Sequence, residues 1–168
     1  MPRIQVEALI SVDRNQLYHL AEDYTRRLEW DRFATRIRFE HGAITSTIGF
    51  AGTAHLFNPF RMRVEHVSLA APSMIAINML EGPAFFSKVK SIWRFESLEE
   101  SVTRVALTCE FQSRWPVLNK AIDPLLAKVL ARDAEHILED FKYAAEDTDV
   151  LSRLSFHGHS VNEIAAAG

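Results

Sequence analysis

Two titratable side chains fall at positions that the sequence pattern places among apolar residues. His66 follows Val64 at a spacing of two in an alternating stretch, and Asp133 interrupts the apolar positions of a long helical pattern. A neutral imidazole can orient a ligand or move a proton near neutral pH. A carboxyl group on a buried face needs a partner or a shifted pKa. His66 and Asp133 are therefore the candidate catalytic groups, with a hydrogen-bonded core histidine and a structural ion pair as the alternatives.

Large aromatic and apolar side chains accompany these two groups at positions expected to face inward. Such residues either line a cavity that stacks on a flat apolar ligand or fill a core. The candidate ligand-binding residues are Trp30, His66, Asn78, Trp93, Phe95, Phe111, Leu126, Val129 and Asp133.

Other reactive residue types do not form a recognisable site. Cys109 alternates with Leu107 and Phe111, so we expect a packed, unreactive thiol. His157 and His159 have the spacing of half a metal site but no third ligand nearby. Phosphate-binding glycine loops, dinucleotide fingerprints and nucleophile elbows are missing from the sequence. We predict no metal and no cofactor.

Composition narrows the class of protein. The chain has 168 residues, a hydrophobic content of 48%, a charged content of 24% and a formal charge of −3. These values are typical of a single globular domain, and no basic run indicates a nucleic-acid partner. No apolar block suggests a signal peptide or an integral membrane segment, so a cytoplasmic location is expected.

The elements that would position the candidate residues follow from periodicity. Residues 4–12 alternate as a half-buried strand, Asp13 offers a helix N-cap with Gln16 three residues on, and 16–28 suit one or two short helices. Short turn signals then separate six candidate strands and favour antiparallel neighbours. These strands are 36–41, 44–57, 61–70, 73–82, 85–99 and 101–115.

The last predicted element is a helix over about 117–145. It would be roughly 40 Å long and carries a broad apolar stripe, so it should be buried along its length against the sheet. The stripe consists of Leu118, Ile122, Leu125, Leu126, Val129, Leu130, Ala134, Ile137 and Phe141. The pattern predicts an α+β helix-grip fold, a curved antiparallel sheet of six to seven strands around this helix. It also predicts one domain over 1–146 and a tail over 147–168.

Local motifs agree with this element order. They are Asp23 to Asp31, Glu81-Gly82-Pro83, Trp93-Arg94-Phe95, Thr103-Arg104-Val105, and Leu130 to Asp133 with Leu138 to Lys142. In order and spacing the chain resembles the START-like, Bet v 1-like superfamily (SRPBCC), in particular its polyketide cyclase/dehydrase branch. The resemblance covers about 3–146.

The resemblance implies a hydrophobic cavity between sheet and helix that binds a lipid, polyketide, quinone or similar molecule. Binding or transport of such an apolar partner is the leading hypothesis. An aromatase/cyclase or dehydrase enzyme is the alternative, and it predicts that His66, Asp133 or Asn78 converge within hydrogen-bond reach of one another or of a shared water. A protein-interaction module acting on the ribosome or a chaperone is a third hypothesis, and a homodimer is left open. Fold alone does not decide between these functions.

Overall fold

The computed structural model describes residues 1–24, 26–39, 51–56, 61–115 and 119–147. The chain begins with a strand and two short helices, continues through six strands and ends in one long helix. The elements are β1 (Arg3–Ile10), α1 (Arg14–Glu22), α2 (Arg27–Trp30), β2 (Ala34–Phe39), β3 (Ala51–Leu56), β4 (Arg61–Ala70), β5 (Met74–Glu81), β6 (Phe86–Glu99), β7 (Val102–Ser113) and α3 (Asn119–Glu146).

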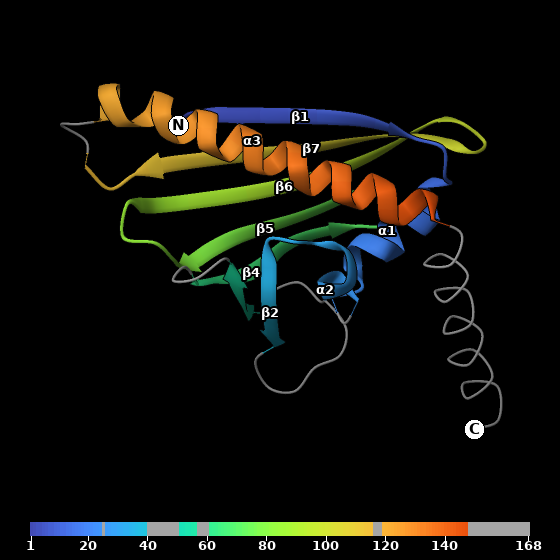
Figure 1. Cartoon of the computed structure of the whole chain (residues 1–168), viewed down its shortest axis with the longest axis horizontal. Coiled ribbons are helices and arrows are strands. Elements are labelled where there is room, and N and C mark those ends of the chain that lie inside the picture. The colour runs from blue at the N-terminus through green and yellow to red at the C-terminus, as the bar shows by residue number, and fades with distance from the viewer. Residues whose placement is uncertain (25, 40–50, 57–60, 116–118, 148–168) are drawn as a thin grey trace.

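The strands form a single curled antiparallel sheet in the order β1-β7-β6-β5-β4-β3-β2. The segment that carries α1 and α2 connects the two edge strands, β1 and β2. Figure 1 shows α3 crossing the sheet, with α1 and α2 beside the end of the sheet where α3 ends. This is the predicted helix-grip architecture.

The predicted elements agree with the observed ones to within a few residues wherever the chain is described. Asp13 caps α1, where its Oδ1 accepts a hydrogen bond from the backbone N–H of Asn15 at 2.8 Å. Outside the described residues lie positions 40–41, 44–50 and 57 of the predicted strands, position 25 of the predicted short helices, 117–118 of the predicted long helix and 148–168 of the tail. The division at residue 146 stays a prediction.

The two faces of the sheet differ in polarity because side chains alternate along each strand. On the inner face Trp93 pairs in register with Leu107 and Ile75, and all three are buried. On the outer face Arg94 and Glu96 are exposed. One face is therefore wet and the other covered, as predicted.

The long helix is not buried uniformly. It packs on β1 and β7, and its C-terminal half contributes Ala134, Leu138, Phe141, Ala144 and Ala145 to the core. In its N-terminal half Leu125 is 64% exposed. The prediction that the helix is buried along its length was therefore wrong for this half. The predicted stripe was too wide, because at 3.6 residues per turn Leu125 points well away from Phe141.

Polar contacts hold the C-terminal half of α3 in place. We call the region where this half of α3 meets α1 and α2 the closed end of the inner face. Arg32, which follows α2, forms a two-pronged ion pair with Asp140 of α3. Lys142 Nζ donates a hydrogen bond to the carbonyl oxygen of Leu9 at 2.9 Å. These contacts attach the C-terminal half of α3 to edge strand β1 and to the segment just before the other edge strand, β2. Neither α3 nor the shorter described helices are long and apolar enough to cross a membrane.

Replacing Phe141 by Ala should lower the free energy of unfolding by about 3–5 kcal/mol, because its fully buried ring leaves a cavity among Trp30, Trp93 and Phe95. Val129→Ala, at a site that is 48% exposed, should cost less than about 1 kcal/mol. Urea denaturation measures both values. Equal losses would contradict the uneven burial of α3.

Candidate functional site

A largely covered cation, Arg27, lies where α2 meets the inner face, and its side chain is 15% exposed. Helix α2 places Arg27, Trp30 and Asp31 three and four residues apart, which brings their side chains to one side of the helix. Arg27 Nε lies 2.8 Å from Asp31 Oδ2. The Arg27 guanidinium carbon is 5.2 Å from the ring centroid of Trp30, 5.7 Å from that of Tyr24 and 5.9 Å from that of Trp93. The three rings and the carboxylate together stabilise this cation.

Asp31 has a second role in the chain's local folding. Its side chain is 4% exposed, and Oδ1 accepts hydrogen bonds from the backbone N–H groups of Phe33 at 2.9 Å and Ala34 at 3.2 Å. This Asx-type turn ends α2 and starts β2. The carboxylate is therefore held by both the guanidinium and the backbone, so Arg27 is anchored to a fixed point.

Tyr24 and His66 form a polar pair beside this cation. Tyr24 Oη lies 2.8 Å from His66 Nε2, and the two rings meet edge to face at 5.4 Å. His66 is 3% exposed. Burial raises the pKa of Tyr24, and the nearby Arg27 opposes this rise only in part. The phenol is therefore protonated at neutral pH and is placed to donate to an unprotonated Nε2.

An aromatic cluster seals this end of the inner face. Phe141 of α3 meets Trp30 at 5.2 Å and Trp93 at 5.1 Å between ring centroids, both edge to face. Phe95 is 2% exposed and stacks on Trp93. Three of the predicted ligand-binding residues, Trp30, Trp93 and Phe95, thus belong to a packed wall next to the polar pair.

The middle of the inner face is less covered than its ends. One row of residues paired in register crosses five strands on this face and consists of Ile4, Cys109, Ser91, Ile77 and His66. The first four are only half-buried, whereas His66 is buried. Beyond this row, Phe111 is 0% exposed and packs on Phe86. Buried aromatic residues therefore bound the half-buried row on two sides.

Cys109 is half-buried in this row, and its thiol has a raised pKa. Burial, with a smaller contribution from Glu110, raises the pKa of Cys109 to about 11. The thiol is therefore protonated at neutral pH, which makes it a weak nucleophile.

Asp133 and Leu126 lie on the N-terminal half of α3, where both are half-buried. Burial raises the pKa of Asp133, while His136 and Arg132 act in the opposite direction. In the described part of the chain no hydrogen bond joins Asp133 to His66. The two candidate catalytic groups are thus not brought into direct contact.

Two predicted ligand-binding residues lie away from the inner face. Asn78 pairs in register with Glu65 and Lys90, and it alternates with the inward Ile77, so it lies on the outer face. Val129 is 48% exposed on α3. Asn78 therefore does not converge with His66, because strand alternation directs Asn78 to the opposite side of the sheet.

The sequence analysis did not single out Arg27 and Asp31. One signal in the sequence could have indicated this pair. Arg27 and Asp31 are four residues apart, with Trp30 between them and Tyr24 three residues before Arg27, which is the spacing of side chains on one side of a helix. Among the described residues, no group of three His, Cys, Asp or Glu side chains could hold a metal ion.

Comparisons with known proteins bear on this geometry. Residues 1–146 match the family model described as polyketide cyclase / dehydrase and lipid transport. The chain belongs to this family. No curated protein matches the sequence.

Solved structures with the same fold superimpose over most of the chain. The Zhui aromatase/cyclase from Streptomyces sp. R1128 is 14% identical with a TM-score of 0.73, covering 86% of this chain and 93% of its own. A START superfamily protein from Mycobacterium smegmatis is 12% identical with a TM-score of 0.69, covering 86% and 97%. Norcoclaurine synthase from Thalictrum flavum, solved with dopamine and hydroxybenzaldehyde, is 8% identical with a TM-score of 0.66, covering 84% of each chain. At these identities the likeness establishes the shared fold.

Replacing Arg27 by Met should lower the free energy of unfolding by about 3–5 kcal/mol, because Asp31 is then buried without its cation. The double variant R27M/D31N should lose less than the sum of the two single variants, since no uncompensated charge remains. Chemical denaturation of the four proteins gives the coupling energy. A coupling near zero would show that the rings and the backbone, rather than the ion pair, hold the cluster.

Proposed function

We propose that this protein binds an apolar small molecule between the inner face of the sheet and the N-terminal half of α3. The half-buried inner row carries the proposal. The apolar side chains of this row face the inside of a curled sheet, yet part of their surface stays uncovered. Each Å² of apolar surface left exposed loses roughly 25 cal/mol of the stabilisation that burial would give. A bound apolar ligand would cover that surface.

The exposure of α3 supports the same location. Leu126 and Leu130 are half-buried, whereas Ala134 and Leu138, further along the helix, are buried. The C-terminal half of α3 is attached to the sheet, whereas the apolar side chains of its N-terminal half stay partly uncovered. A ligand held between these side chains and the inner face would occupy a site lined by apolar groups, as small-molecule sites typically are.

The polar cluster at the closed end would orient the ligand. Trp30 Nε1 is buried and has no hydrogen-bond partner among the described residues. A buried donor without a partner calls for an acceptor. The ligand class that fits is therefore an elongated or flat apolar molecule with one acceptor, such as a carbonyl oxygen, at the end that meets Trp30, Tyr24 and His66.

Ser91 offers a direct test because it lies in the middle of the half-buried row, between Ile77 and Cys109. If the new ring enters unfilled space, Ser91→Phe should change the free energy of unfolding by less than about 1 kcal/mol. The control Val105→Phe, at a site that is 0% exposed, should lower the free energy of unfolding by about 1–3 kcal/mol or more, because the added ring overpacks the core. The uncharged probe N-phenyl-1-naphthylamine should gain fluorescence with the wild-type protein. Ser91→Phe should weaken its binding by about tenfold or more.

Native mass spectrometry of the purified wild-type protein would show any ligand that copurifies. A wild-type protein that binds no probe and no copurifying molecule, together with a Ser91→Phe variant as unstable as Val105→Phe, would show that the inner face is a filled core.

A catalytic role is the second candidate, favoured by the buried Tyr24–His66 pair. A ketone oxygen bound at this end would replace His66 as the acceptor of the phenol proton. Nε2 would then be available to take a proton from the carbon next to the carbonyl, which yields an enolate whose oxygen accepts a hydrogen bond from the Tyr24 phenol. Such positioned acid–base groups typically contribute about 10²–10⁴-fold to a rate.

The catalytic role predicts that the protein accelerates exchange of solvent deuterium into the carbons next to the carbonyl of benzylacetone, followed by NMR. Tyr24→Phe should lower this acceleration by about a hundredfold while probe binding is kept, because only the hydroxyl group is removed. Glu139→Gln, at an exposed position of α3, serves as the control and should leave the rate unchanged. A wild-type protein that binds the probe but does not accelerate exchange would restrict the function to binding.

A further inference from the structure

The outer face of β2, β3 and β4 carries a grid of four arginines. In the strand register Arg36 and Arg61 flank His55, while Arg38 and Arg63 flank Thr53. Residues paired across neighbouring strands share a face, so all four project from the same side. That side is the outer one, since the register pairs the alternating residue Val64 with inward Met79.

This grid has a surplus of positive charge. Arg36, Arg38 and Arg61 are exposed, and within the described ranges none of them forms an ion pair. Arg63 lies 3.7 Å from Glu81. Glu65 lies on the same face, so among the described residues here four arginines are accompanied by two carboxylates, although the whole chain has a formal charge of −3. Like charges placed side by side are destabilising, which makes an external anion the natural partner.

A depression of about 280 Å³ lies within the grid. Thr53, Arg61, Arg63, Glu81 and Gly82 line it. It is open to solvent and places the Thr53 hydroxyl group beside two guanidinium groups, of which that of Arg63 is paired with the Glu81 carboxylate. Guanidinium groups bind phosphate oxygens through paired hydrogen bonds, so Arg61 is the group in this depression that is available to a lipid phosphate.

Exposed apolar side chains lie at the same edge of the sheet. The register pairs the end of β7 with the start of β6 and the end of β5 with the start of β4, so these termini meet at one edge. Trp115, just after β7, is 46% exposed, and Leu80, near the end of β5, is 39% exposed. Arg114 lies next to Trp115 in the chain. We call this set the basic edge; it consists of Arg36, Arg38, Arg61, Arg63, Arg114, Leu80 and Trp115.

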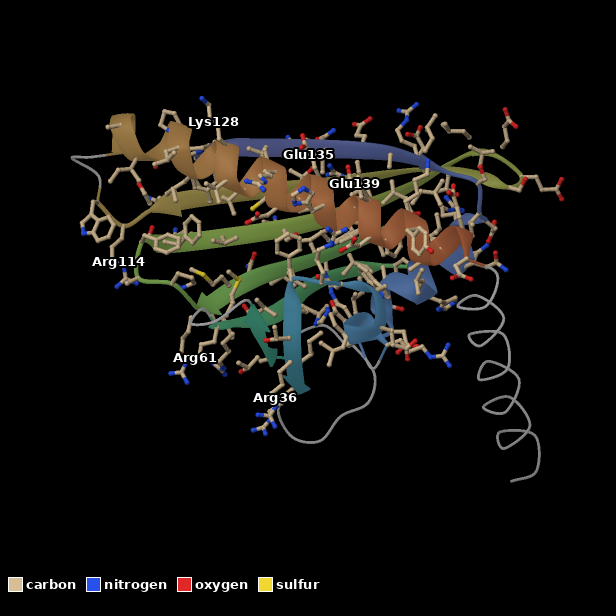
Figure 2. The ribbon with its side chains drawn as sticks, in the orientation of Figure 1. Arg36, Arg61, Arg114, Lys128, Glu135 and Glu139 are labelled. Atoms are coloured by element: carbon tan, nitrogen blue, oxygen red, sulfur yellow. The ribbon has the colours of Figure 1, made fainter. Side chains whose placement is uncertain are left out.

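Figure 2 shows how charge is distributed over the molecule. Arg114, Arg61 and Arg36 follow one another along the edge of the sheet, and Lys128 lies on α3 above the same end. Glu135 and Glu139 lie further along α3, away from that end. The four labelled basic residues thus lie toward one end of the molecule, although the protein as a whole has a formal charge of −3.

We propose that the basic edge docks on the surface of an anionic lipid bilayer. Each arginine near such a surface contributes about 1 kcal/mol, so several are needed for measurable binding. Trp and Leu side chains beside basic residues are the groups that enter the headgroup region of a bilayer. A nucleic acid would use the arginines but would leave Leu80 uncovered, so the combination favours a bilayer.

The proposal is independent of the bound small molecule, because docking uses the outer face and the edge of the sheet. The test uses the full-length protein and vesicles of phosphatidylcholine, with or without about 30% phosphatidylglycerol. The wild-type protein should sediment with the anionic vesicles only, and about 0.5 M salt should release it, because the Debye length is then only a few ångströms. Arg36→Glu with Arg61→Glu should weaken binding by about tenfold or more.

Matched controls locate the surface. Arg3 and Arg94 are exposed arginines outside the basic edge, so R3E/R94E changes the net charge equally and should bind like the wild type. Trp30 and Trp93 are 9% and 4% exposed, which leaves Trp115 as the tryptophan able to reach lipid. Brominated phosphatidylglycerol should therefore quench the fluorescence of the wild-type protein more than that of Trp115→Phe.

Three results would overturn the proposal. The first is equal binding to neutral and anionic vesicles. The second is an equal loss in R36E/R61E and R3E/R94E. The third is binding of duplex DNA or of an acidic protein through these arginines while anionic vesicles are left unbound. Circular dichroism and thermal unfolding of each variant ensure that a lost interaction is not a lost fold.

Discussion

The attachment of one half of α3 to the sheet is the constraint on which the other features depend. Phe141 packs edge to face against Trp30 and Trp93, and Arg32 and Lys142 connect the same half of the helix to α2 and β1. Helix α3 contacts β1 and β7, and in the row that crosses the inner face from Ile4 to His66 the side chains up to Ile77 stay half-buried.

The polar cluster lies at the boundary between these two regions. Arg27, Asp31, Tyr24 and His66 are costly to bury, and each has a partner that offsets the cost. Their rigidity follows from several contacts made at once, namely the guanidinium with three rings and Asp31 with two backbone N–H groups. A site that orients a ligand needs groups held in this way.

The inner and outer faces serve different chemistry. Strand alternation directs Val64 inward and Arg63 outward on the same strand, so one strand contributes both to the apolar interior and to the basic edge. Membership of the polyketide cyclase / dehydrase and lipid transport family fits an apolar ligand. The basic edge adds a surface through which a protein of this fold can meet a source of such ligands.

The sequence by itself determined the fold class, the strand and helix ranges of the described chain and the inward position of His66, because periods of 2 and 3.6 are written in the order of residues. It also identified Trp30, Trp93 and Phe95 as inward aromatic residues. Only the tertiary structure decided that Tyr24 meets His66, that Arg27 lies among three rings and that Asn78 faces outward. It alone aligned Arg36 with Arg61, since periodicity carries no information on which strands pair or in which register. Contacts between residues far apart in the chain depend on packing, and packing exists only once the sheet has closed around the helix.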